Sequence, residues 1–212
     1  MFPLIPVLIA IGTGIAAVEI IDRVTDGDTA PGAGGDGKAP RSILLLGDSL
    51  AVGLSGPLGK LARDRGIGFS HAAISGTRID QWEKGTGGTS LDKSLAALEP
   101  GSLVLVSLGT NDFKAGQPEV ARASARSIVE KVAAKGAGLI WILPPTMPFS
   151  DLGVRAALES ELASLNVRAY PSQTIDIPRA GDQIHATPAG YSSWADAIAA
   201  WIPLAAVSAS SS

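Results

Sequence analysis

The hydrophobic and polar positions divide the chain into an apolar beginning, a polar stretch and a long patterned region. From residue 42 onward, apolar runs of strand length alternate with segments whose apolar residues recur about every 3.6 positions. Such alternation is typical of a parallel sheet with helices on both faces. The sequence therefore predicts one α/β domain over residues 42–203.

The apolar runs and the periodic segments give the expected positions of strands and helices. Strands are expected at residues 42–46, 67–73, 103–108, 139–143 and 167–170. Helices are expected at residues 50–63, 79–82, 91–98, 119–135, 152–165 and 188–201. The third strand is expected in the buried centre of the sheet and the fifth at an edge. Gly56 and Pro57 are expected to bend or interrupt the first helix, because proline lacks the backbone donor that a helix interior needs.

The apolar beginning, residues 1–22, differs from everything that follows it. Residues 2–18 are apolar or small throughout, a length at the lower edge of what spans a membrane. The segment lacks the Lys or Arg that opens a secretory signal, although residues 14–16 fit a cleavage site. Three interpretations stay open: a membrane anchor, a cleaved signal, or a helix that contacts a partner protein through residues 2–21. We expect an anchored or exported protein of the cell envelope, with a virus particle as an alternative location.

Two further segments have little to bury. Residues 23–41 are rich in Gly, Pro and Asp, which predicts a flexible tether between the apolar segment and the domain. Residues 204–212 end in a run of serines and are expected to be a disordered tail.

Composition and charge exclude several classes of function. The chain has 17 Lys and Arg against 20 Asp and Glu, and no basic run that could neutralise a series of phosphates, so no nucleic-acid partner is expected. It has no cysteine, which excludes disulfides, thiolate metal sites and a cysteine nucleophile. His71 and His185 are its two histidines, too few for a typical catalytic zinc centre. We expect neither a metal nor an organic cofactor.

A candidate nucleophile, Ser49, lies where the first strand gives way to its helix. This is the carboxyl edge of the predicted sheet, where open α/β proteins bind their ligands. A serine hydroxyl becomes a good nucleophile only when a neighbouring base takes its proton. The alternative is that Ser49 merely caps the helix, a position where serine is common.

The candidate base is His185, which precedes the last predicted helix. Asp182 stands three residues ahead of it, and a carboxylate at that spacing in a tight turn can reach Nδ1. Such a contact fixes the tautomer of the imidazole and stabilises its charged form during reaction. The alternative is a surface turn pair without a catalytic partner. His71, within the second predicted strand, is expected to be a core or edge histidine.

Candidate oxyanion donors follow the second and third predicted strands. A tetrahedral oxyanion needs donors that are already in place, and the side-chain amide of Asn111 and the N–H groups of Gly76 and Ser49 can supply three. Alternatively, Asn111 is a turn residue that bonds its own backbone. We expect Asp48 and Asp112 to support their loops.

Four segments resemble, in order, the conserved blocks of the SGNH hydrolases, the GDSL-like lipases and esterases. They are Gly-Asp-Ser-Leu at 47–50, the glycine of Ser-Gly-Thr at 75–77, Gly-x-Asn-Asp at 109–112 and Asp-x-x-His at 182–185. The resemblance covers about residues 42–202. It implies a flavodoxin-like, three-layer α/β/α fold, a triad of Ser49, Asp182 and His185, and an oxyanion hole formed by Ser49, Gly76 and Asn111.

The activity that the resemblance implies is hydrolysis of a carboxylic ester through an acyl-enzyme. The short connections between the four segments leave little chain for a deep lipid tunnel. We therefore expect short acyl groups, above all O-acetyl groups on a carbohydrate or cell-envelope glycan. The alternatives are a lipase, lysophospholipase or thioesterase of the same family, acyl transfer to a second alcohol, and a non-catalytic structural or binding component of an envelope or virus particle.

Overall fold

The centre of the molecule is a five-stranded parallel sheet, seen in a computed structural model that describes residues 39–202. The strand order is β2-β1-β3-β4-β5. The strands are β1 (Ser42–Gly47), β2 (Gly68–Ala73), β3 (Leu103–Ser107), β4 (Gly138–Ile142) and β5 (Arg168–Tyr170). The expected apolar N-terminal helix, most of the expected tether and the expected tail lie outside the described residues.

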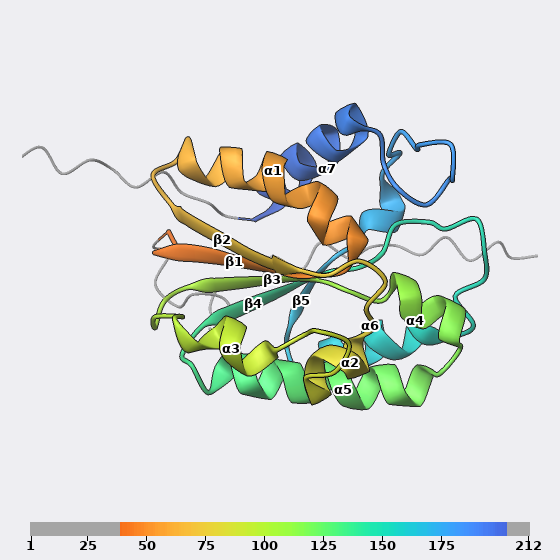
Figure 1. The fold of residues 1–212 in the computed structure, drawn as a ribbon, viewed down its shortest axis with the longest axis horizontal. Helices are drawn as coiled ribbons and strands as arrows, with labels where there is room; N and C mark the ends of the chain where they lie inside the picture. The colour runs from red at the N-terminus through yellow and green to blue at the C-terminus, as the bar shows by residue number, and fades with distance from the viewer. Residues whose placement is uncertain (1–38, 203–212) are drawn as a thin grey trace, which may run out of the picture.

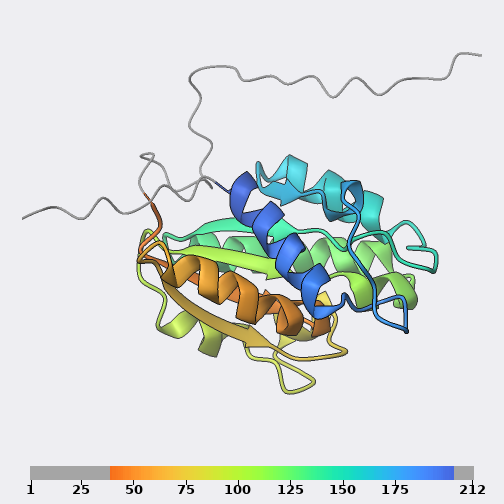
Figure 2. The same ribbon diagram turned by 90° about the horizontal axis from the view of Figure 1, so that it is seen from above.

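Helices cover both faces of this sheet (Figures 1 and 2). On one face lie α1 (Ser49–Arg63) and α7 (Pro188–Trp201). The other face carries α2 (Ile79–Lys84), α3 (Leu91–Ala96), α4 (Thr110–Ala115), α5 (Pro118–Ala133) and α6 (Val154–Ser164). A single 3-10 turn, η1 (Ser172–Thr174), follows β5. The predicted three-layer α/β/α fold is confirmed.

The strands divide their side chains between two hydrophobic cores. Leu44 and Leu46 of β1 lie in the core under α2, α3, α5 and α6, whereas Ile43 and Leu45 lie in the core under α1 and α7. This follows from the period of two along a strand, which sends successive side chains to opposite faces. All five residues of β3 are buried, as predicted for a central strand.

Helix α1 continues through Pro57, so of the expected bend or interruption the interruption is wrong. The helix runs without a break from Ser49 to Arg63. Its buried stripe, with Leu54 and Leu58 on either side of the expected break, packs on the sheet and on α7. Burial of that stripe offsets the cost of an interior proline, which is about 3 kcal/mol.

Helix α4 is the element that the hydrophobic pattern does not reveal. It has six residues and ends at Gly116, in the left-handed conformation. Its sequence, TNDFKA, contains one large apolar side chain, Phe113, so no apolar period can be recognised. Among residues 39–202, no helix is long and apolar enough to cross a membrane.

Candidate active site

Ser49 is the first residue of α1, and its neighbour Asp48 caps the helix. Oδ1 of Asp48 accepts a hydrogen bond from the backbone N–H of Leu50 at 2.9 Å. The capping interpretation of Ser49 is therefore wrong. Within the described residues, neither the hydroxyl nor the backbone N–H of Ser49 has a hydrogen-bond partner. An unpaired N–H at the start of a helix is well suited to hold a negatively charged oxygen.

The turn before α7 holds Asp182 against His185. Oδ2 of Asp182 lies 2.5 Å from Nδ1 of His185, and its Oδ1 accepts from the backbone N–H groups of Ile184 and His185, each at 2.9 Å. Gln183 completes the turn in the left-handed region, with φ of 58°. The hydrogen bond from His185, helped by the two N–H groups, lowers the pKa of Asp182 to about 2. Asp182 is therefore a carboxylate at neutral pH, able to orient the imidazole.

This turn is fixed to the rest of the domain through Arg179. Its Nη1 donates to the backbone oxygen of Ile184 at 2.6 Å, and its Nη2 donates to the backbone oxygen of Thr146 at 2.9 Å. Arg179 also forms an isolated antiparallel bridge with Ala186. One guanidinium thus joins the His185 turn to the loop that follows β4.

The packing of α7 on α1 brings the turn to the Ser49 end of the sheet (Figure 2). The ring of Tyr191, in the first part of α7, lies directly over Gly53 of α1, where a Cβ atom would overlap it. A protonated His185 is close enough to lower the pKa of the buried Asp48, the residue next to Ser49. In the described residues, no hydrogen bond joins Ser49 to His185. Such bonds are commonly long in ligand-free enzymes and shorten when substrate binds.

The side chain of Asn111 connects the three loops that carry the expected oxyanion donors. Its Nδ2 donates to the backbone oxygen of Thr77 at 2.9 Å and to Oδ2 of Asp48 at 3.3 Å. Asn111 therefore bonds two other loops and not its own backbone, contrary to the turn interpretation. Gly76, beside Thr77, is exposed and has φ of 80°, a conformation that favours glycine. The structure thus brings together the start of α4 with Asn111, the β2–α2 loop with Gly76 and the start of α1 with Ser49.

Two buried carboxyl groups support these loops. Burial raises the pKa of Asp48 to about 7, and the nearby charge of Asp112 adds to the increase. Burial likewise raises the pKa of Asp112 to about 6, although both of its oxygens accept from the backbone N–H of Ile79 at 3.3 Å. The carboxyl groups fix the ends of the loops that carry Ser49 and Gly76.

His71 lies apart from these residues. It pairs with Leu45 of β1 from its position in the edge strand β2, and it is exposed, as an edge histidine would be.

Across residues 39–202, no cluster of three His, Asp or Glu side chains could hold a metal ion.

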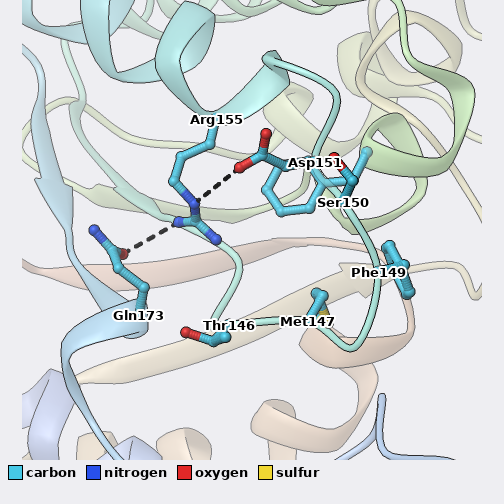
Figure 3. Close-up of a pocket in the computed structure, with 8 residues that line it drawn as sticks. Thr146, Met147, Phe149, Ser150, Asp151, Arg155 and Gln173 are labelled. Atoms are coloured by element: carbon cyan, nitrogen blue, oxygen red, sulfur yellow. Dashed lines mark hydrogen bonds and ion pairs between the residues drawn. The ribbon is translucent and has the colours of Figure 1, made fainter.

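A cavity of about 410 Å³ lies in the region that follows β4 (Figure 3). Its lining residues are Phe113, Thr146, Met147, Phe149, Ser150, Asp151, Arg155 and Gln173. The sequence pattern did not reveal it, because the lining comes from α4, the β4–α6 loop, α6 and η1. Its one sequence signal is the proline-rich connection at residues 144–153 at the carboxyl edge of the sheet.

Comparisons with known proteins agree with this architecture. The sequence profile of the GDSL-like lipase/acylhydrolase family matches residues 45–202. No curated protein matches the chain significantly.

Solved structures share the fold at low sequence identity. An aryl esterase of M. smegmatis has a TM-score of 0.59 and 19% identity, over 76% of this chain and 98% of that one. The psychrotrophic esterase EstA of Pseudoalteromonas sp. has a TM-score of 0.63 and 20% identity, over 76% and 95%. A Bacillus subtilis protein has a TM-score of 0.60 and 18% identity. The match covers 74% of this chain and 55% of that protein.

Proposed function

The chain belongs to the GDSL-like lipase/acylhydrolase family, as its sequence predicted, and we propose that it is a serine esterase. In this proposal Ser49 is the nucleophile. The observation that carries the assignment of roles is the Asp182–His185 contact, held at the end of the sheet where Ser49 begins α1. A carboxylate that orients an imidazole near a serine hydroxyl is the arrangement of an acyl-transfer triad, which supports the proposal.

The proposed reaction has two halves. His185 takes the hydroxyl proton of Ser49 as its oxygen bonds the ester carbonyl carbon, and the N–H groups of Ser49 and Gly76 with the amide of Asn111 hold the oxyanion. The C–O bond to the alcohol then breaks, and His185 protonates the departing alcohol. Water, deprotonated by His185, next attacks the acyl-enzyme, which releases the acid and returns the proton to Ser49.

We propose short acyl groups on a carbohydrate or cell-envelope glycan as substrate, with acetyl esters foremost. The connections that follow β1, β2 and β3 at the site are short, so they offer little wall for a long acyl chain. The polar residues of the nearby cavity support a hydroxylated substrate over a lipid.

Replacement of Ser49 tests the proposal directly. Ser49→Ala should abolish turnover of p-nitrophenyl acetate while the circular dichroism spectrum and Tm stay native. Ser55→Ala is the matched control, because Ser55 is another serine of α1 whose hydroxyl only donates to the backbone oxygen of Val52. Full activity of the Ser49→Ala variant would end the assignment of this nucleophile.

Two further measurements separate the alternatives. A series of p-nitrophenyl esters from acetyl to decanoyl should show a preference for acetyl, and a strong decanoyl preference would instead indicate a lipase or thioesterase. A fluorophosphonate probe should label Ser49 in the folded protein. Failure of that labelling would favour a non-catalytic structural or binding component.

We also propose that residues 2–21 direct the domain to the cell envelope, as an anchor, a signal or a partner contact. Fractionation of the native source and the intact mass of the recovered protein test this. Recovery of the uncleaved protein in the soluble cell fraction would contradict it.

A further inference from the structure

The cavity behind the β4–α6 loop has one apolar and one polar part (Figure 3). The side chains of Phe113, Met147 and Phe149 provide the apolar part. The polar part consists of Thr146, Ser150, Asp151, Arg155 and Gln173. Ligand pockets commonly combine an apolar lining with a few polar groups that fix the orientation of the ligand.

Arg155 is a fixed element of the polar part. Its Nη2 donates to the backbone oxygen of Pro144 at 2.8 Å, and its Nη1 donates to Oε1 of Gln173 at 3.2 Å. The guanidinium also lies 3.6 Å from the carboxylate of Asp151 and 5.1 Å from the centre of the Phe113 ring. The side chain is only 17% exposed. A guanidinium held in this way supports the cavity wall, and Asp151 offsets its charge, so an anionic ligand gains little there.

Gln173 retains hydrogen-bonding capacity for a ligand. Its Nε2 donates one hydrogen, to Glu159 at 3.4 Å, and within the described residues the second hydrogen has no partner. The side chains of Thr146 and Ser150, both exposed residues, add hydroxyl groups to the lining. The cavity is therefore suited to a neutral ligand that carries several hydroxyl groups.

A sugar ring has this combination of surfaces. Its C–H faces pack on aromatic and thioether groups such as Phe149 and Met147, while its hydroxyl groups exchange hydrogen bonds with polar side chains. A long alkyl chain would fill the same space but would cover these polar groups and leave them without partners, at a cost of about 1–3 kcal/mol for each group that it buries. The lining therefore favours a carbohydrate over a lipid.

The position of the cavity indicates which part of an ester it receives. The backbone oxygen of Thr146, at the cavity, accepts from Arg179, which also donates to Ile184 beside His185. His185 is the group that protonates the departing alcohol in the proposed reaction, so the alcohol part of the ester lies on its side of Ser49. The cavity and the His185 turn are joined on that side.

We infer that this cavity is a subsite for the sugar that forms the alcohol part of the ester. This inference rests on the proposed esterase function and names its substrate class. Phe149 and Met147 receive a face of the ring, and Gln173, Ser150 and Thr146 bond its hydroxyl groups.

Inhibition of p-nitrophenyl acetate turnover by free sugars tests the inference. Xylobiose, cellobiose and N,N′-diacetylchitobiose serve as probes, and octanol serves as the alkyl comparison. At least one disaccharide should inhibit, and Gln173→Ala and Phe149→Ala should each weaken that inhibition about 10-fold, as the loss of one hydrogen bond or one ring contact predicts. Lys84→Ala, at a separate surface pocket between α2 and α5, is the matched control and should leave the inhibition constant unchanged.

Two variants are used so that misfolding of one does not decide the test. Gln173→Ala removes a partly exposed group from the polar part of the cavity, and Phe149→Ala removes a ring from its apolar part. Inhibition by octanol and by none of the sugars would overturn the inference, as would unchanged inhibition constants in both variants. In either case the turnover itself, and its loss in Ser49→Ala, would still support the esterase. Full turnover in Ser49→Ala would instead reject the proposed function.

Discussion

The amide of Asn111 already donates to the carboxyl group of Asp48, at 3.3 Å, in the resting site. Its other hydrogen goes to the backbone oxygen of Thr77 at the shorter distance of 2.9 Å. An amide has two hydrogens, so an oxyanion must take one of them from its present acceptor. The longer bond to Asp48 is the weaker of the two, and we expect it to be the one that yields. Asp48 thus aligns the amide before substrate arrives.

Replacement of Asp48 by asparagine should damage catalysis more than folding. Asparagine caps helices as well as aspartate does, so α1 keeps its start, but an NH₂ group near Asn111 cannot accept from its amide. We expect kcat for p-nitrophenyl acetate to fall, by at most the roughly 10²- to 10³-fold that removal of a whole oxyanion donor costs. Asp48→Ala removes the cap as well and should also lower Tm. An unchanged kcat in Asp48→Asn would show that Asn111 needs no such support.

The buried carboxyl groups should make the domain more stable in mild acid than at neutral pH. Burial raises the pKa of Asp48 from 3.8 to about 7 and that of Asp112 from 3.8 to about 6. The folded state therefore binds protons more tightly than the unfolded state, and the stability from these two groups is lost as pH rises from about 4 to about 7. Urea unfolding at pH 5 and at pH 8 measures the difference. In Asp48→Asn the difference should shrink, and an equally steep dependence would contradict the assignment to Asp48.

Loss of the Asp182 carboxylate should affect the rate and its pH dependence together. Asp182→Asn removes the charge that stabilises the imidazolium of His185, and the amide group can hold the wrong tautomer. The expected decrease in kcat is about 10²- to 10⁴-fold. Because the pKa of Asp182 is lowered to about 2, the wild-type carboxylate stays charged in mild acid and loses its contribution only as pH falls from about 4 toward 2. A variant with wild-type kcat at pH 7 would remove Asp182 from the triad.

A methyl group added at Gly53, between α1 and α7, should move the His185 turn away from Ser49. Gly53→Ala places a Cβ atom inside the Tyr191 ring, so α7 must move and take the His185 turn with it. We expect a loss of about 1–3 kcal/mol in the free energy of unfolding, together with a decrease in kcat.

Gly56→Ala is the matched control in the same helix, because its Cβ would meet no other part of the chain. Its unfolding free energy should stay unchanged or rise by up to about 1 kcal/mol, because alanine is favoured over glycine inside a helix. Equal effects of the two variants, measured by urea unfolding, would mean that the Tyr191 contact is not responsible.

Much of the fold follows from local pattern, whereas the connections of the site do not. The buried run at Leu103–Ser107 and the Asp182–His185 spacing each lie within a few residues, so periodicity and turn length predict them. The bond from Asn111 to Thr77 spans 34 positions, and only the assembled sheet edge brings the two residues together. Gly56 and Pro57 were expected to bend or interrupt α1, and the interruption is absent because propensity considers the helix alone, without the burial that holds it.

Asp48 caps α1, so the neighbouring Ser49 does not have to combine helix capping with its proposed catalytic role. The side chain of Asp48 caps the helix, while the hydroxyl of Ser49 has no hydrogen-bond partner within residues 39–202. The side chain at position 49 is consequently not needed to cap α1. If Ser49 is the nucleophile as proposed, one base change that replaces it leaves a folded but inert domain, so catalytic and non-catalytic descendants of such a chain stand a single mutation apart.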